Sequence, residues 1–236
     1  MNAALTMLPA LDLAAFAAFM ALWVGYTLMA DRMTADGHSL LSATARHRRT
    51  WMRNLCDREV RVADGALLGN LMRSVSFFAS ASILILGGLL ALIGSGDRAY
   101  AVVQDLPLVS ASGRGVFEIK AILLAGVFVY AFFQITWSLR QFNYCCILLG
   151  AAPPPEAEAA AKDTFAEHAA RLNELGAASF NRGLRAYYFA LAMMTWFIHA
   201  GVFVAATLAV VGVLYRREFR SKTMKALHAA LPGPRP

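Results

Sequence analysis

The chain has 236 residues, of which 58% are apolar and only 16% are charged. This composition argues against a soluble domain and indicates a membrane protein that crosses the bilayer several times. The formal net charge of +7 gathers beside apolar runs, over residues 46–61 and 216–225, where contacts with anionic lipid headgroups are expected. Nucleic acid is the weaker interpretation, because no binding motif or aromatic platform accompanies the charge.

Four apolar runs predict transmembrane helices over about residues 8–30, 75–93, 117–139 and 186–215. The third continues as a helix to residue 150, because nothing breaks it before Gly150 and the prolines that follow. The last run exceeds the ~20 residues that a crossing needs, so it tilts, extends beyond the membrane or bends near Gly201. Asp12 lies too near the outer end of the first run to be expected in the core.

Two amphipathic helices are predicted outside the membrane on the cytoplasmic side, over residues 39–62 and 156–176. In the first, apolar residues recur at helical spacing, while Arg46, Arg49 and Arg53 form a basic stripe on another face. This helix either packs on the protein in solvent or lies in the interface, where its arginines bind phospholipid phosphates. The sequence therefore predicts an all-α, polytopic membrane domain over residues 1–220, followed by a mobile tail over 221–236.

The distribution of basic residues also predicts an orientation. The loops after the first and third spans are rich in Arg and Lys, so the positive-inside rule places both in the cytoplasm. The N-terminus then lies outside. We expect the protein to be a multi-pass protein of the bacterial inner membrane. Four spans would also place the C-terminus outside, which conflicts with the bases between Arg216 and Lys225. A hairpin bend within the last span would remove this conflict.

Polar residues at one membrane boundary form the first candidate site. Arg140, Asn143 and Tyr144 share a helix surface by three- and four-residue spacing, and Asn181 and Arg185 precede the last span at the same boundary. If the two helices are neighbours, the guanidinium groups form a pocket for phosphate or carboxylate. In the other interpretation the arginines reach the headgroup region and the amides tie two helix ends together.

Gln134 and His199 lie inside predicted spans, and a polar group at such depth is a functional hypothesis. We favour the structural interpretation, in which a neutral imidazole hydrogen-bonded to Thr195 or Gln134 only holds two helices together. The three cysteines and five histidines show neither disulfide nor metal-ligand spacing. We therefore expect no metal and no other cofactor.

Three strings carry a family resemblance: Trp137-Ser-Leu-Arg-Gln-Phe-Asn-Tyr-Cys145, Gly150-Ala-Ala-Pro153 and Asn181-Arg-Gly-Leu-Arg-Ala-Tyr-Tyr-Phe189. With them the chain resembles a bacterial and plant family catalogued as domain of unknown function 599, over about residues 76–219. Phe142 stands where the family has Tyr, which removes one hydroxyl. The resemblance implies an integral membrane protein with four helices, and it implies no activity.

The preferred functional hypothesis is a non-enzymatic scaffold or accessory subunit that self-associates or joins a larger membrane complex and binds anionic lipid. The alternative is a small channel or transporter for an ion or small anion, which would use Gln134, His199 and the boundary arginines. A lipid-modifying enzyme is disfavoured, because the sequence offers no nucleophile–base pair or metal set.

Overall fold

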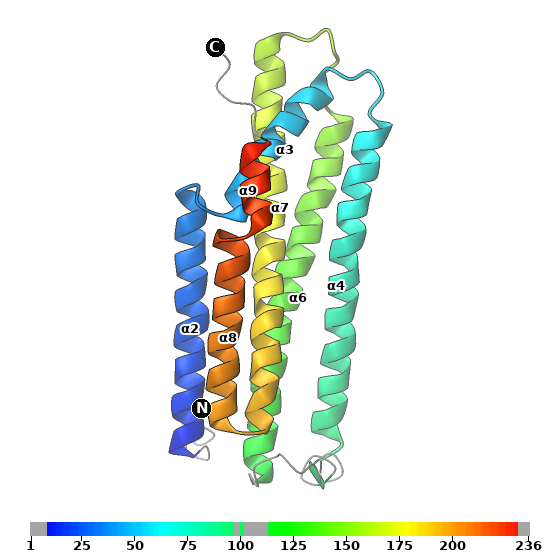
Figure 1. Ribbon diagram of the computed structural model, residues 1–236. Helices are drawn as coiled ribbons and strands as arrows, with labels where there is room; N and C mark the ends of the chain where they lie inside the picture. The colour runs from blue at the N-terminus through cyan, green and yellow to red at the C-terminus, as the bar shows by residue number, and fades with distance from the viewer. Residues whose placement is uncertain (1–8, 97–99, 102–112, 231–236) are drawn as a thin grey trace. The chain divides into compact units, whose positions relative to one another are not determined.

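The computed structural model describes residues 9–96, 100–101 and 113–230. In this part of the chain the elements are α2 (Ala10–Ala35), α3 (Leu40–Cys56), α4 (Val62–Gly94), α6 (Arg114–Gly150), α7 (Ala159–Met194), the 3-10 helix η1 (Thr195–Phe197), α8 (Ala200–Phe219) and α9 (Lys222–Ala229) (Figure 1). Four helical stretches are long and apolar enough to cross a membrane: Ala10–Cys56, Val62–Gly94, Arg114–Gly150 and Ala200–Leu227. The predicted class, an all-α protein with four membrane-spanning candidates, is confirmed.

The chain divides into two compact units, and most of the long helices contribute to both. The first unit comprises Met1–Met29, Ser80–Phe132 and Gly183–Leu214. The second comprises Ala30–Ala79, Phe133–Arg182 and Tyr215–Pro236.

The core of the first unit is aromatic. Phe19 on α2 is almost fully buried, and its ring lies 5.8 Å from that of Phe189 on α7 and 5.0 Å from that of Phe203 on α8. Trp196 in η1 stacks on Phe203 with the ring centroids 5.1 Å apart. Ring pairs at such distances add an attraction beyond the burial of apolar area. These contacts hold α2, α7 and α8 together.

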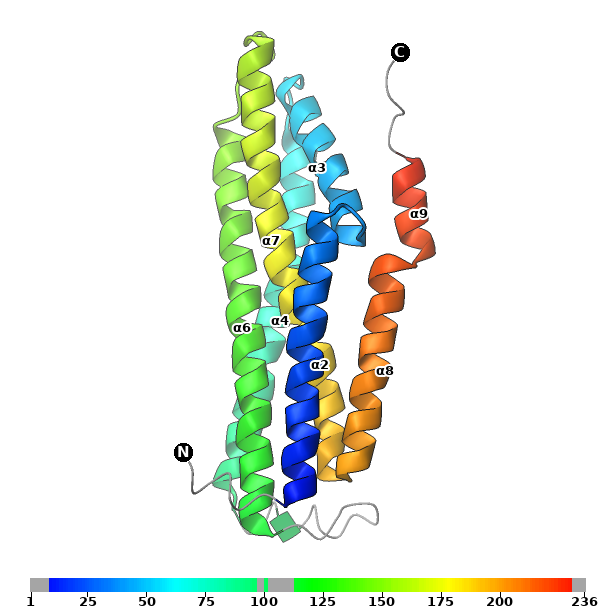
Figure 2. The ribbon, with the colours of Figure 1, turned by 90° about the vertical axis from the view of Figure 1, so that its left-hand side faces the viewer.

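The segment predicted as one span over residues 186–215 is a helical hairpin. α7 ends at Met194, η1 turns the chain, and α8 returns from Ala200 (Figure 2). The backbone N–H of Gly201 donates to His199 Nδ1 at 3.0 Å, which satisfies a donor in the first turn of α8. The bend therefore falls just before Gly201, as one of the three alternatives for this run has it, and the single span over residues 186–215 is corrected to the end of α7 and a returning α8.

Other predicted boundaries also change: α3 ends at Cys56 rather than at residue 62, and α4 begins at Val62, before the span predicted from residue 75. The helix predicted over residues 156–176 does not stop there, because α7 continues without a break to Met194. The tail predicted to be mobile contains α9 over Lys222–Ala229, while its last residues, 231–236, lie outside the described part of the chain.

Asp12 is buried, which contradicts the expectation from its position near a helix end. The residue is only 7% exposed, and its carboxylate accepts a hydrogen bond from Trp196 Nε1 at 2.7 Å. Lys120 on α6 approaches the same carboxylate at 3.2 Å and donates to the Trp196 carbonyl, also at 3.2 Å. The carboxylate is tolerated in the core because a buried cation and an indole N–H compensate it.

The second unit has an alanine-rich core between α3 and α7. Met52 and Leu55 on α3 pack with three alanines of α7, namely Ala166, Ala169 and Ala170. Beside this core, the guanidinium of Arg61 donates to the carbonyl oxygens of Leu55, Ala152 and Pro153. One cation thus satisfies backbone acceptors at the ends of both α3 and α6.

Candidate functional site

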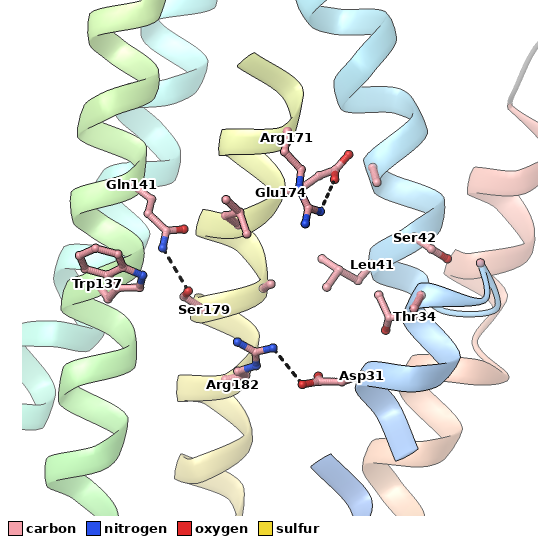
Figure 3. Close-up of a pocket in the computed structure, with 15 residues that line it drawn as sticks. Asp31, Thr34, Leu41, Ser42, Trp137, Gln141, Arg171, Glu174, Ser179 and Arg182 are labelled. Atoms are coloured by element: carbon pink, nitrogen blue, oxygen red, sulfur yellow. Dashed lines mark hydrogen bonds and ion pairs between the residues drawn. The ribbon is translucent and has the colours of Figure 1, made fainter. Parts of the chain in front are cut away.

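A pocket of about 560 Å³ lies in the second unit, between the end of α2, the start of α3, and facing stretches of α6 and α7 (Figure 3). The turn between α2 and α3 forms one side. Gly37 adopts a φ of +81°, which glycine permits without strain. Ser39 then caps α3 through reciprocal hydrogen bonds with Ser42. These local features fix the first turn of α3 over the pocket, whose volume is in the range of small-molecule sites.

Two ion pairs line this pocket (Figure 3). Arg182 Nη2 on α7 lies 2.9 Å from Asp31 Oδ2 on α2, and Arg171 Nη1 lies 3.4 Å from Glu174 Oε2 within α7. All four side chains keep part of their surface exposed. The described lining therefore carries two positive and two negative groups, and its formal charge sums to zero.

Gln141 and Ser179 form a polar wall between α6 and α7. Gln141 is only 6% exposed, and its Nε2 donates to Ser179 Oγ at 3.5 Å (Figure 3). Its Oε1 has no hydrogen-bond partner among the described residues. Buried side-chain acceptors are normally paired, so this oxygen remains able to accept a hydrogen bond from a ligand. Trp137, one helical turn earlier on α6, adds an indole that is half exposed.

A close approach of α6 to α7 positions this wall. Ser138 Oγ donates to the carbonyl of Gly176 at 2.7 Å. A Cβ atom added at Gly176 would lie 2.9 Å from the ring of Phe142, which is fully buried. Only a glycine at this position allows the ring of Phe142 to press against the α7 backbone. The contact lies within one turn of both Gln141 and Ser179.

A second feature of the same unit is a basic surface formed where α9 packs on α3. His47 Nε2 lies 2.8 Å from the carbonyl oxygen of Leu227, and this contact joins the two helices. Arg46, Lys222 and Lys225 are all exposed. We call these three residues the α3–α9 basic surface.

Two members of the predicted basic stripe are engaged by acids instead. Arg53 lies 2.6 Å from Asp163 and 2.9 Å from Asp57, and Arg49 lies 3.8 Å from Glu167. The pairs with Asp163 and Glu167 tie α3 to the start of α7. Within the described chain, Arg46 is the member of the stripe that makes no ion pair.

The five residues of the predicted anion pocket are divided between the units. Arg140, Asn143 and Tyr144 are exposed on α6 in the second unit, and Arg140 Nε donates to the Tyr144 hydroxyl at 2.8 Å. Asn181 lines a smaller cavity of about 180 Å³ in that unit. Arg185 belongs to the first unit, where it is buried with its guanidinium 5.7 Å from the ring centre of Tyr26. A joint anion site of Arg140 and Arg185 stays a prediction.

Neither of the two polar residues predicted at membrane depth lines the pocket. Gln134 is half-buried on α6. His199 is exposed in the turn before α8, where it accepts a hydrogen bond from Gly201, so its placement well inside a continuous span is corrected. The Thr195 hydroxyl, one of the two partners suggested for the imidazole, donates instead to the Ala192 carbonyl at 2.7 Å.

Sequence reasoning missed the central residues of the pocket. Asp31 and Arg182 are 151 positions apart, so no local spacing connects them. Gln141 and Arg182 do occur within the strings that carry the family resemblance, next to the residues selected from those strings. The sequence signal that could have found them is this adjacency, because Gln141 and Arg182 directly follow Arg140 and Asn181 and lie on the helix faces that line the pocket.

A family model described as a protein of unknown function, DUF599, matches residues 14–223, which is most of the chain. No curated protein and no solved structure matches.

Proposed function

This chain belongs to the family of proteins of unknown function DUF599, and we propose that it is a non-enzymatic scaffold or accessory subunit of a bacterial inner membrane. In this proposal the second unit lies in the cytoplasm and binds anionic lipid through the α3–α9 basic surface. The protein self-associates or joins a larger membrane complex through its lateral apolar faces. The observation that carries the proposal is the packing of α9 on α3.

That packing supports one consistent orientation. The Arg-rich loop before α4, the loop before α7 and the bases after Tyr215 all belong to the second unit. If this unit faces the cytoplasm, every basic cluster satisfies the positive-inside rule, and the N-terminus is outside. In this proposal the last turns of α7 cross as well, as the partner of α8 in the hairpin and in addition to the four stretches that are long and apolar enough by themselves, and this fifth passage returns the C-terminus to the same side. The conflict that four straight spans create in the sequence then disappears.

A paired-cysteine experiment tests this orientation. In a variant whose native cysteines are replaced, we expect single cysteines at Ser42 and Ser221 to resist a membrane-impermeant thiol reagent in intact cells. Both should react after the membrane is permeabilised. Labelling of one position but not the other in intact cells would contradict the hairpin topology.

The lipid-binding part of the proposal rests on exposed, unshared charge. Near an anionic membrane surface each Lys or Arg contributes about 1 kcal/mol of attraction. Replacing Arg46, Lys222 and Lys225 together with Gln should therefore remove most of the preference for phosphatidylglycerol over phosphatidylcholine in nanodiscs. The matched control is Arg49→Gln, because Arg49 is paired with Glu167 and should contribute little. An unchanged preference for phosphatidylglycerol in the triple variant would contradict the assignment of lipid binding to the α3–α9 basic surface.

The lateral surface of α4 supports the scaffold over the channel. Gly87 and Ala91 are exposed, and a Cβ atom added at Gly87 meets nothing within 4 Å. Small residues on a lipid-facing helix allow close approach of another helix. A channel instead requires a continuous polar lining. The buried Ser82 hydroxyl of α4 does not contribute to one in this proposal, because it is hydrogen-bonded to the Tyr187 hydroxyl at 2.7 Å. Detergent-solubilised protein is therefore expected to be larger than one copy by native mass spectrometry.

A further inference from the structure

The pocket between α2, α3, α6 and α7 has the features of a binding site that the scaffold proposal does not require. It is lined by residues from four helices, and its volume of about 560 Å³ would accept a lipid headgroup or a small metabolite. Its polar groups converge from both sides of the cavity: Asp31 comes from α2, Gln141 from α6 and Arg182 from α7 (Figure 3).

The charges favour a ligand that carries both signs. Asp31 and Glu174 are balanced by Arg171 and Arg182. A simple anion would meet the two arginines but also two carboxylates, so electrostatic complementarity is poor. A zwitterion can place its anionic group at the guanidinium groups and its cationic group at the carboxylates. Phosphate suits the guanidinium fork, which offers several N–H donors in one plane.

The buried amide of Gln141 restricts which cationic group the ligand can carry. Gln141 donates one N–H of Nε2 to Ser179, and its Oε1 is a buried acceptor that has no partner among the described residues. That oxygen needs a donor. A primary ammonium supplies three N–H donors, whereas a trimethylammonium supplies none.

The apolar part of the lining indicates where the rest of the ligand lies. Leu41, Leu175 and the half-exposed indole of Trp137 complete the wall. Trp137 stands where the apolar run of α6 gives way to polar residues, which is the level of a membrane–water interface. An acyl or glycerol segment would pack against these side chains while the headgroup enters the polar end.

We propose that this pocket binds a molecule that carries a primary ammonium together with a phosphate, as the phosphatidylethanolamine headgroup and free phosphoethanolamine both do. The phosphate binds Arg171 and Arg182. The ammonium binds next to Asp31 and donates to Gln141 Oε1. The inference is independent of the α3–α9 basic surface, which selects for negative charge rather than for a hydrogen-bond donor.

The test compares lipids that differ only in the donor. Full-length protein in detergent is titrated with phosphatidylethanolamine and phosphatidylcholine of identical chains, and bound lipid is counted by native mass spectrometry. We expect phosphatidylethanolamine to bind about tenfold more tightly, the factor that one hydrogen bond to a charged group supplies. Equal binding of the two lipids would overturn the proposal, whatever the variants do.

Two substitutions assign the preference to the pocket. Gln141→Met removes the acceptor at nearly constant volume and should abolish the preference, while Gln134→Met on the same helix, outside the pocket, should retain it. Retention in Gln141→Met, with circular dichroism unchanged, would overturn the assignment. Gln141→Glu should increase the preference, because a carboxylate accepts more strongly from an ammonium. A decrease would mean that the amide presents its N–H groups, which also overturns it.

The source of the ligand is settled by competition. If free phosphoethanolamine at millimolar concentration displaces the lipid, the pocket accepts the soluble zwitterion. If free phosphoethanolamine does not displace the lipid, and Gln141→Met weakens the binding of phosphatidylethanolamine alone, the ligand is the membrane headgroup. In either case the triple substitution of Arg46, Lys222 and Lys225 should leave the preference for the ammonium intact. This separates a failure here from a failure of the scaffold proposal.

Discussion

Gly176→Ala tests the close contact between α6 and α7 that positions the pocket. A Cβ atom at this position would lie 2.9 Å from Cε1, 3.0 Å from Cζ and 3.2 Å from Cδ1 of Phe142. Carbon atoms pack at about 3.5–4.0 Å, so the ring or the helix must move by about 0.5–1 Å. Phe142 is fully buried and has little room to do so.

The magnitude follows from two opposing effects. Overpacking a buried contact destabilises by about 1–3 kcal/mol. Replacing glycine by alanine inside a helix returns up to about 1 kcal/mol. We expect a net loss of about 1 kcal/mol in the free energy of unfolding, which lowers Tm by about 2–4 °C for a chain of this length.

Gly69→Ala is the matched control, because Gly69 also lies in a helix of the second unit and an added Cβ there meets nothing within 4 Å. It should raise Tm by about 2–4 °C, since only the propensity gain remains. The two variants are compared by circular dichroism during heating in one detergent. The double variant Gly176→Ala with Phe142→Leu should lose less free energy of unfolding than the two single variants lose together, because the smaller side chain relieves the clash. An equal or higher Tm for Gly176→Ala, or strict additivity in the double variant, would refute the packing argument.

Three further changes probe other parts of the chain. Asp12→Asn should destabilise the protein by about 3–5 kcal/mol, because Lys120 is left as an uncompensated buried cation, and adding Lys120→Met should restore much of the Tm. The hydrogen bond from Lys162 holds the pKa of Asp57 below its ordinary value. The pair therefore stabilises the fold at pH values above the unfolded pKa of about 4, and this contribution is lost as the pH falls through the lower folded pKa. Asp57→Asn should reduce Tm at pH 7 and leave Tm unchanged at a pH below the folded pKa. Gly87→Leu should leave Tm unchanged, because nothing lies near it, but should reduce the size of the detergent-solubilised protein; if both quantities stay constant, this face of α4 contacts only lipid.

Much of the architecture could be read from hydrophobic periodicity and length. The first three apolar runs correspond to helices α2, α4 and α6, because in a bilayer an unbroken apolar stretch has to satisfy its backbone internally. The stop of α6 at Gly150 agrees with the glycine and prolines that follow. The strings around Trp137 and Asn181 were sufficient to identify the family.

Contacts between distant residues account for what the pattern could not show. The bend at η1 lies within an apolar run that has no proline, and Trp196 stabilises it by packing on Phe203 and donating to Asp12. A local window cannot contain such partners. The burial of Asp12 has the same origin, since its cation arrives from α6.

The pocket, too, depends on tertiary contacts. Its Asp31–Arg182 pair joins the end of α2 to the middle of α7, and Gln141 is buried because Gly176 admits α6 so closely. Periodicity assigns a residue to a helix face but does not say which helix covers that face. Composition and pattern were therefore enough for the membrane class and for the positions of the apolar runs, whereas several helix ends, the hairpin, the buried ion pair and the pocket required the packing of helices far apart in the chain.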